Sequence, residues 1–405
     1  EGDCIYYDSM NPHGMIAVNG KDCIFYAIVL NPTGEPIPEF SAPKAVSDTS
    51  SPYKDSEDRI YKKFIDVKED ENGTPTEIKF KNTEKFNFAF DIVDGLAKTK
   101  PDKLAMLHVD RHHVERNFTF KDMKRASNQT ANYFKSLGIK KGDRVMLVLK
   151  RHYQFWYCMV ALHKLGAIAI PATNQLKEHD FSYRYNAAGV SAIVCTADGD
   201  TADIAMNAAK DCPSVKTFIM VNGVREGWHD FNGEMEQCSD VFPRPSKEEG
   251  AFGSDLMLMF FTSGTTGYPK IAAHNHKYPL GHFTTAKFWH NVNPDGMHFT
   301  ISDTGWGKAL WGKLYGQWMC EAPIFTYDFD KFNAHDILPM FKQYNITTFC
   351  APPTMYRMMM QADVDAHDLS TLTYCTTAGE ALNPDLFDFW KEHTGLTIFE
   401  GFGQT

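Results

Sequence analysis

The residues best suited to chemistry lie between positions 262 and 270, where the sequence reads TSGTTGYPK. Gly264 and Gly267 let the backbone adopt positive φ, which exposes amide N–H groups. Hydroxyl donors come from Thr262, Ser263, Thr265 and Thr266. Lys270 adds a mobile positive charge at the end of the run. Donors and a cation in a glycine-bearing loop predict a site for a phosphate.

The alternative is a serine- and threonine-rich surface turn, which an isolated S-G-T would favour. The full run is more specific, because its glycines, four hydroxyls and Pro-Lys ending directly follow an apolar segment. The P-loop pattern G-x-x-x-x-G-K-[ST] occurs nowhere in the chain. The sequence therefore predicts a phosphate-binding loop of a different kind.

Hydrophobic periodicity predicts the elements that position this loop. The run LMLMFF, from Leu256 to Phe261, is too short for a helix and predicts a strand in a sheet covered on both faces. Upstream, Thr119 and Asp122 form a capping-box-like start to an amphipathic helix that Gly138 ends. The strand-like runs RVMLVLK, AIAIP and AIVCTAD alternate with helical segments. This alternation predicts an α/β fold built from stacked αβαβα subdomains, with mostly parallel sheets and a smaller β-rich part.

A chain of 405 residues is expected to divide into two to four subdomains. We predict an amino-terminal extension and linker over residues 1–80, a first α/β subdomain over 81–254, and a second over 255–405 that carries the nucleotide loops. Within the extension, the charged run KEDENGTPTE at 68–77 is expected to be a solvated loop.

The composition limits the classes of binding partner and the cellular location that we expect. The chain is 43% hydrophobic and 23% charged, with a net charge of -10, which argues against a general affinity for nucleic acid. No apolar run reaches the roughly 18 residues of a membrane span, and the first residues lack a signal core. A cytoplasmic protein is expected. The nine scattered cysteines include no C-x-x-C and are expected to be structural thiols, and the sixteen histidines lack metal spacing.

The segment at 302–318, SDTGWGKALWGKLYGQW, holds four glycines and three tryptophans. Large flat side chains beside backbone without Cβ atoms suit a shaped apolar cavity. They equally suit a packed core corner in which the aromatic rings need glycine to fit. The sequence does not distinguish the apolar cavity from the packed core corner.

Three segments in order resemble the signature loops of the acyl-adenylate-forming superfamily: TSGTTGYPK at 262–270, TTAGEAL at 376–382 and EGFGQT at 400–405. Other segments of the chain, including KLGAIAIPAT and FCAPPTMYR, are most similar to medium-chain or short branched-chain acyl-CoA synthetases. The likeness covers residues 86–405. It implies activation of a carboxylic acid with ATP and Mg²⁺ to acyl-AMP, followed by transfer to coenzyme A.

The resemblance also implies roles for single residues. Lys270 would act on the β- and γ-phosphates, and Thr405 would lie near the α-phosphate and the magnesium ion; these two are the catalytic candidates. The other predicted nucleotide-binding residues are Thr262, Ser263, Gly264, Thr265, Thr266, Gly267, Gly379, Glu380, Ala381, Glu400, Gly401, Phe402, Gly403 and Gln404. Phe402 would stack on adenine, and Gln404 would lie near the adenylate. The candidates for the acyl pocket are Trp306, Gly307, Lys308 and Trp311, and Gln175 is placed at the coenzyme A channel.

The family pattern continues beyond Thr405 with a lid domain that carries a catalytic lysine, and the sequence printed here does not include it. These residues are therefore expected to adenylate an acid very poorly by themselves and to make no acyl-CoA. Two alternatives stay open: an adenylating enzyme with a carrier-protein acceptor, and a non-catalytic ATP- or AMP-binding regulatory module. A homodimer is a possible assembly.

Overall fold

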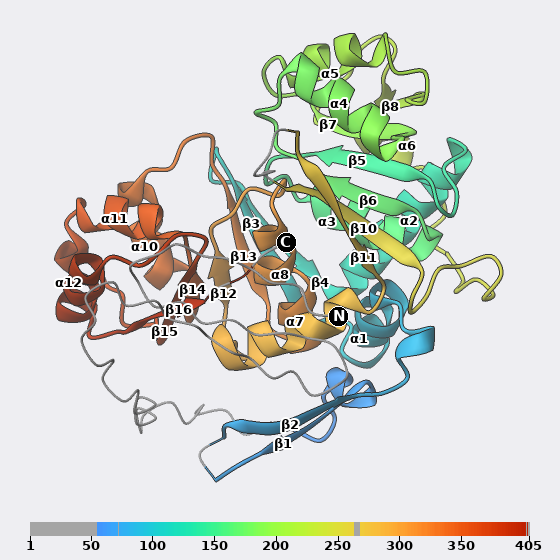
Figure 1. Cartoon of the computed structure of the whole chain (residues 1–405). Helices are drawn as coiled ribbons and strands as arrows, with labels where there is room; N and C mark the ends of the chain where they lie inside the picture. The colour runs from blue at the N-terminus through green and yellow to red at the C-terminus, as the bar shows by residue number, and fades with distance from the viewer. Residues whose placement is uncertain (1–54, 72, 263–267, 402, 404–405) are drawn as a thin grey trace, which may run out of the picture.

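Helices cover the faces of two seven-stranded sheets in the computed structural model, which describes residues 55–71, 73–262, 268–401 and 403 (Figure 1). The strands are β1 (Ile65–Glu69), β2 (Pro75–Phe80), β3 (Leu104–Asp110), β4 (Glu115–Thr119), β5 (Arg144–Val148), β6 (Ile168–Pro171), β7 (Ala192–Thr196), β8 (Thr217–Val221), β9 (His229–Asp230), β10 (Leu256–Thr262), β11 (Lys270–Asn275), β12 (His298–Thr300), β13 (Ile324–Asp328), β14 (Thr348–Cys350), β15 (Tyr374–Ala378) and β16 (Ile398–Gly401).

The α-helices are α1 (Asp94–Thr99), α2 (Phe120–Ser136), α3 (Gln154–Leu165), α4 (Glu178–Ala188), α5 (Thr201–Ala209), α6 (Phe231–Met235), α7 (Tyr278–Thr284), α8 (Gly307–Lys313), α9 (Tyr315–Met319), α10 (Ala334–Gln343), α11 (Pro353–Met360) and α12 (Pro384–Thr394). Two π-helical turns, η3 (Ala89–Val93) and η4 (Thr285–Trp289), precede α1 and follow α7. Short 3-10 turns span Ile60–Lys63, Thr83–Lys85 and Val364–Ala366. No helix among the described residues has the length and apolar character to cross a membrane.

The first sheet has the strand order β11-β10-β6-β5-β7-β8-β9, and only the β10–β11 pair is antiparallel. The second sheet has the order β16-β15-β14-β12-β13-β3-β4, and only β3–β4 is antiparallel. The predicted α/β fold with mostly parallel sheets is therefore confirmed. The predicted capping box at Thr119 and Asp122 is also present at the start of α2.

The sheets do not follow the predicted boundary between residues 254 and 255. Strands β10 and β11 come after it but extend the first sheet, whereas β3 and β4 come before it and form the edge of the second. Each sheet thus takes strands from both halves of the chain. The segment at 256–262 is a strand as predicted, but it lies next to the sheet edge, and only Met257, Leu258 and Phe260 in it are fully buried.

Residues 55–80 are not a linker. The run at 68–77 contributes to the antiparallel hairpin of β1 and β2, so its interpretation as a solvated loop was wrong. Ile60, Tyr61 and Ile65 are buried in the main hydrophobic core. Residues 1–54 lie outside the described part of the chain.

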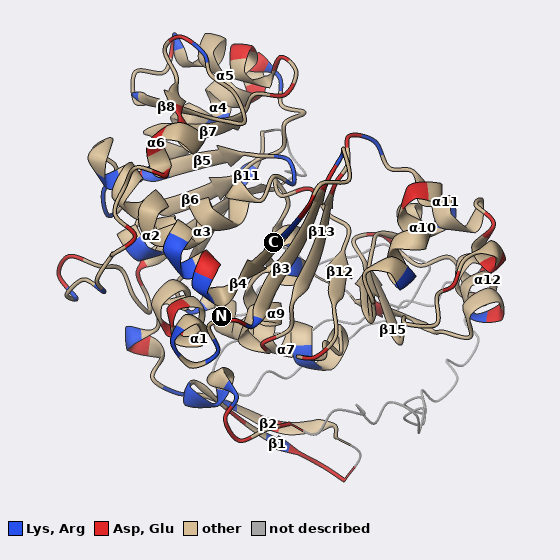
Figure 2. Ribbon diagram, turned by 180° about the vertical axis from the view of Figure 1, so that it is seen from behind, with Lys and Arg blue, Asp and Glu red and all other residues tan. Residues whose placement is uncertain are grey.

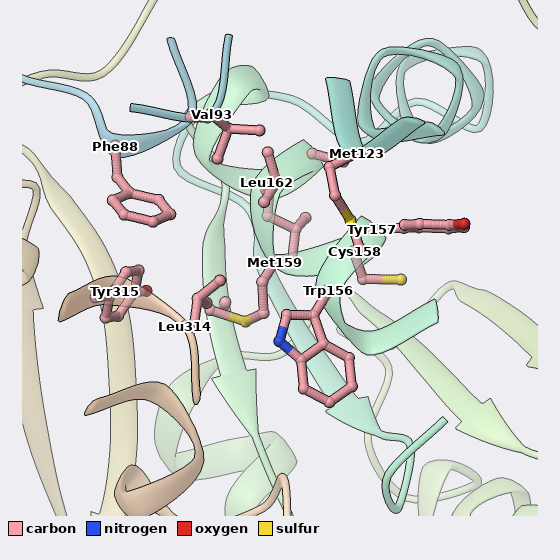
Figure 3. Packing of buried hydrophobic residues seen from close by; sticks show 14 of the residues in the cluster. Phe88, Val93, Met123, Trp156, Tyr157, Cys158, Met159, Leu162, Leu314 and Tyr315 are labelled. Carbon is pink, nitrogen blue, oxygen red and sulfur yellow. The ribbon is translucent and has the colours of Figure 1, made fainter. Parts of the chain in front are cut away.

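Helix α3 is the centre of the largest core, and all twelve of its residues are buried. A helix that is apolar on every side must be covered on every side. Trp156 and Met159 face Leu314, from the turn between α8 and α9, and Leu162 lies toward Val93 (Figure 3). This packing fixes the position of α8, which carries candidate site residues.

Candidate functional site

The first candidate loop connects β10 to β11 at the edge of the first sheet. Thr262 and Lys270 are partners in the antiparallel register, and the Thr262 hydroxyl donates to the Lys270 carbonyl oxygen at 3.4 Å. Lys270 is exposed at the start of β11. Ser263, Gly264, Thr265, Thr266 and Gly267 lie outside the described residues. The two ends of the loop are therefore placed, and the phosphate contacts predicted for it stay a prediction.

The second and third motifs lie side by side in the other sheet. Strands β15 and β16 are parallel neighbours, and Ala378 pairs with Gly401. Directly after β15, Gly379 has a φ of +106°, which side chains with a Cβ atom rarely adopt. Two chain segments about twenty residues apart thus end together at the carboxyl edge of the sheet, where ligands bind in α/β proteins.

The acidic side chains of these motifs have partners inside the protein. Glu380 accepts a hydrogen bond from the Thr354 hydroxyl at 2.8 Å, and Glu400 accepts one from the Leu382 amide at 3.2 Å. Ala381 is exposed. Gly403 is described and exposed, whereas Phe402, Gln404 and Thr405 lie outside the described residues. Their predicted contacts with adenine, adenylate and magnesium stay predictions.

Helix α8 lies between strand β10 of the first sheet and the turn after β15 of the second. A Cβ atom on Gly307 would lie 3.8 Å from the Phe260 ring of β10. The next residue, Lys308, donates from Nζ to the carbonyl oxygen of Ala378, and its Nζ is 3.5 Å from where a Cβ atom on Gly379 would be. The sequence predicted Lys308 for the acyl pocket, and the structure places its amine against the predicted nucleotide-binding turn. Burial lowers the pKa of this amine.

An aromatic cluster stands beside this turn. Trp311 packs against Trp289 and His290, with ring centroids 5.6 and 5.7 Å apart. A Cβ atom on Gly401 would lie 2.4 Å from the Trp289 ring, so this tryptophan covers the end of β16. Trp306, by contrast, is 56% exposed. Sequence reasoning missed Trp289 and His290, because nothing in the local pattern around them marks a contact with residues more than a hundred positions away.

The glycines at 302–318 allow close packing. A Cβ atom on Gly305 would lie 2.3 Å from the Thr173 backbone nitrogen, and one on Gly316 would lie 2.1 Å from the His282 carbonyl oxygen. At these two positions the packed-corner reading holds. The contact of Gly305 also joins α8 to the segment after β6 that carries the exposed Gln175. The coenzyme A role of Gln175 stays a prediction.

Gly305→Ala is expected to destabilise the protein by about 1–3 kcal/mol, because the added methyl group meets backbone atoms that cannot rotate away. Urea unfolding of the variant and the wild type measures the difference. Gly307→Ala is the control, since its nearest neighbour atom would be 3.8 Å away. Equal losses in both variants would show that the contact with Thr173 does not matter.

Lys313, at the end of α8, is 1% exposed and donates to the Ser302 carbonyl oxygen at 2.7 Å. Burial and the nearby charge of Arg151 lower its pKa from 10.5 to about 7. Between these two values the unfolded chain binds more protons than the folded protein. The contribution of Lys313 to the free energy of unfolding must therefore rise with pH across this window.

Compared with Lys313→Met, the wild type should gain roughly 3 kcal/mol of stability between pH 7 and pH 10. Urea unfolding at both pH values tests this. The control is Lys342→Met, which removes an amine whose side chain is 53% exposed. Parallel pH profiles for the wild type and Lys313→Met would contradict the argument.

The α/β fold places the second and third glycine-bearing segments on neighbouring strands, β15 and β16. Residues 94–405 match the AMP-binding enzyme family, and the chain belongs to this family. It is 34% identical over 331 residues to the human mitochondrial acyl-coenzyme A synthetase ACSM3, covering 80% of this chain and 55% of that protein. It is 36% identical over 330 residues to mouse mitochondrial ACSM5, covering 80% of this chain and 56% of the other.

Solved structures show the same fold. The anthranilate CoA ligase AuaEII, in complex with anthranoyl-AMP, superposes with a TM-score of 0.72 at 24% identity, over 79% of this chain and 60% of that one. An acyl-CoA synthetase from Brucella canis gives a TM-score of 0.72 at 20% identity, over 80% and 58%. The chain spans a little over half the length of the two relatives named above.

Proposed function

We propose that this chain forms the nucleotide-binding part of an AMP-forming acid–thiol ligase. The carboxylate oxygen of the acid attacks the α-phosphorus of ATP, the bond to pyrophosphate breaks, and acyl-AMP forms. The thiol of coenzyme A then attacks the acyl carbon and displaces AMP. The family membership and the names of the relatives support this assignment, and a medium-chain or short branched-chain fatty acid is the proposed substrate.

The observation that carries the proposal is that α8 lies against both β10, through Gly307, and the turn after β15, through Lys308. Two anions must approach each other in the first step, so fixed donors and cations are needed where negative charge accumulates. Lys308 is held at the turn that follows β15, and Lys270 is exposed at the mouth of the β10–β11 loop. Mg²⁺, when bound, would neutralise negative charge on the phosphates, and Thr405 is the residue proposed to hold it. A cytoplasmic location and a homodimer are further proposals.

Calorimetry with a non-hydrolysable acyl-AMP analogue tests this function without requiring turnover. An octanoyl or isovaleryl sulfamoyl adenosine should bind at least about tenfold more tightly than adenosine 5′-sulfamate, because the acyl pocket adds buried apolar contact. Equal affinities would contradict the ligase assignment. They would favour the alternative, a regulatory module that binds the nucleotide and ignores the acid.

A further inference from the structure

Helix α4 covers one face of the first sheet together with α5 (Figure 2). Phe181 and Tyr185, on one side of α4, are completely buried among side chains of β5, β6, β7 and β8. In the first turn of the helix, the Asp180 carboxylate accepts a hydrogen bond from the Lys177 amide at 3.1 Å. These buried contacts make α4 a fixed support for the groups that its other side chains contact.

Two further side chains of α4 contact the hairpin of β10 and β11 at the edge of this sheet. The guanidinium carbon of Arg184 lies 5.2 Å from the centre of the Phe261 ring, on β10. Tyr183 contacts the other arm, where its ring stacks on Tyr268 with the centroids 4.7 Å apart and the planes at 18°. The helix therefore contacts the described residues at both ends of the first candidate loop.

The hydroxyl group of Tyr183 also holds the backbone next to Lys270. It donates to the carbonyl oxygen of Pro269 at 2.8 Å, and this carbonyl belongs to the peptide bond that leads into Lys270. After the same lysine, the Lys270 carbonyl oxygen accepts from the Thr262 hydroxyl at 3.4 Å. The proline ring fixes its own φ near −65°. The backbone of Lys270 is thus held on both sides of its Cα atom.

This support matters because β11 is the edge strand of the first sheet and pairs with β10 on one side. The amine of a lysine stands on a flexible four-carbon stem, so its reach depends on where the Cα atom is held. A group that is already held in place loses less freedom when its ligand binds. We propose that Tyr183 is a positioning residue, which holds the backbone of Lys270 where its amine meets the terminal phosphates of ATP. This role rests on the proposed function, under which Lys270 acts on the β- and γ-phosphates.

Calorimetry with ATP and with AMP tests the role. Tyr183→Ala should weaken ATP binding at least about fivefold and AMP binding less than about twofold, because only ATP carries the phosphates that Lys270 meets. A residue that merely stabilised the fold would change both affinities alike. The control is His179→Ala, on the same helix, which removes a side chain that is 80% exposed and should change neither affinity more than about twofold.

Three results would overturn the proposal: equal weakening of ATP and AMP binding in Tyr183→Ala, an unchanged affinity of this variant for ATP, or a wild type that binds ATP no more tightly than AMP. Tyr183→Phe keeps the stacked ring and loses the hydroxyl donor, so its affinity for ATP should fall about two- to threefold. This variant decides if Tyr183→Ala does not fold. Wild-type affinity for ATP in Tyr183→Phe would contradict a role for the hydrogen bond to Pro269.

Hydrogen exchange tests the support of the hairpin without any nucleotide. The amides of residues 268–275 should exchange at least about fivefold faster in Tyr183→Ala than in the wild type, because local opening becomes easier when the stack and the hydrogen bond are lost. In His179→Ala they should exchange at the wild-type rate. An unchanged rate in Tyr183→Ala would show that its ring does not hold this arm, and the proposal would fall.

The ligase proposal and the role of Tyr183 can fail separately. The acyl-AMP analogue carries neither a β- nor a γ-phosphate, so Tyr183→Ala should bind it as tightly as the wild type does. If the wild type does not prefer this analogue over adenosine 5′-sulfamate, the ligase proposal fails. The comparison of ATP with AMP and the exchange rates then still decide whether Tyr183 positions Lys270.

Discussion

Glu321→Ala is expected to destabilise the protein by about 3–5 kcal/mol, the loss seen when one partner of a buried ion pair is removed. Its carboxylate is completely buried and accepts hydrogen bonds from Arg59 at 2.8 Å, from Lys100 at 2.8 Å and from the Ile60 amide at 2.9 Å. Truncation would remove the buried carboxylate that all three donors share, and a buried donor is costly when it loses its acceptor. Because Glu321 holds both Arg59 and the backbone of Ile60, which is buried in the main core, the segment at 55–80 should loosen first.

Urea unfolding gives the loss in free energy, and limited proteolysis should show earlier cleavage near residues 55–80. The control is Glu77→Ala, which removes a carboxylate that pairs with Lys68 and Lys79 on the exposed hairpin. Exposed pairs contribute about 0–1 kcal/mol. If Glu321→Ala lowers the free energy of unfolding by less than about 1 kcal/mol, the buried ion pairs of Glu321 do not stabilise the fold appreciably.

Gly379→Ala is expected to weaken binding of the acyl-AMP analogue at least about tenfold, which corresponds to a loss in binding free energy of about 1.4 kcal/mol. The φ of +106° cannot be kept by alanine without strain, so the turn after β15 must change. Lys308 is hydrogen bonded to the preceding carbonyl oxygen and would move with the turn. Calorimetry with the octanoyl analogue measures the change in affinity.

Gly395→Ala is the control, since Gly395 also has a positive φ, of 73°, but lies at the end of α12 with open space around it. It should lose a similar amount of stability and keep its affinity for the analogue. Retained affinity in Gly379→Ala would remove this turn from the nucleotide site. Lost affinity in both variants would indicate a general loss of folding.

The sequence alone determined the local elements and the order of the motifs. Hydrophobic periodicity depends only on neighbouring residues, so it predicted the strand at 256–262, the helix that begins after Thr119 and the alternation that makes parallel sheets. The three glycine-bearing segments could be identified for the same reason. Each is a short run in which glycine indicates a backbone conformation that other residues rarely adopt, and Gly379, with its positive φ, is an example.

Only the tertiary structure decided which strands share a sheet and which side chains meet. Strands β10 and β11 join the first sheet and β3 and β4 the second, because pairing across a hundred residues leaves no local mark. The same holds for Glu321 with Arg59, 262 positions away, and for Lys308 with Ala378, 70 away. A charged residue can be buried only where distant partners compensate its lost hydration, and that compensation exists only after the chain has folded.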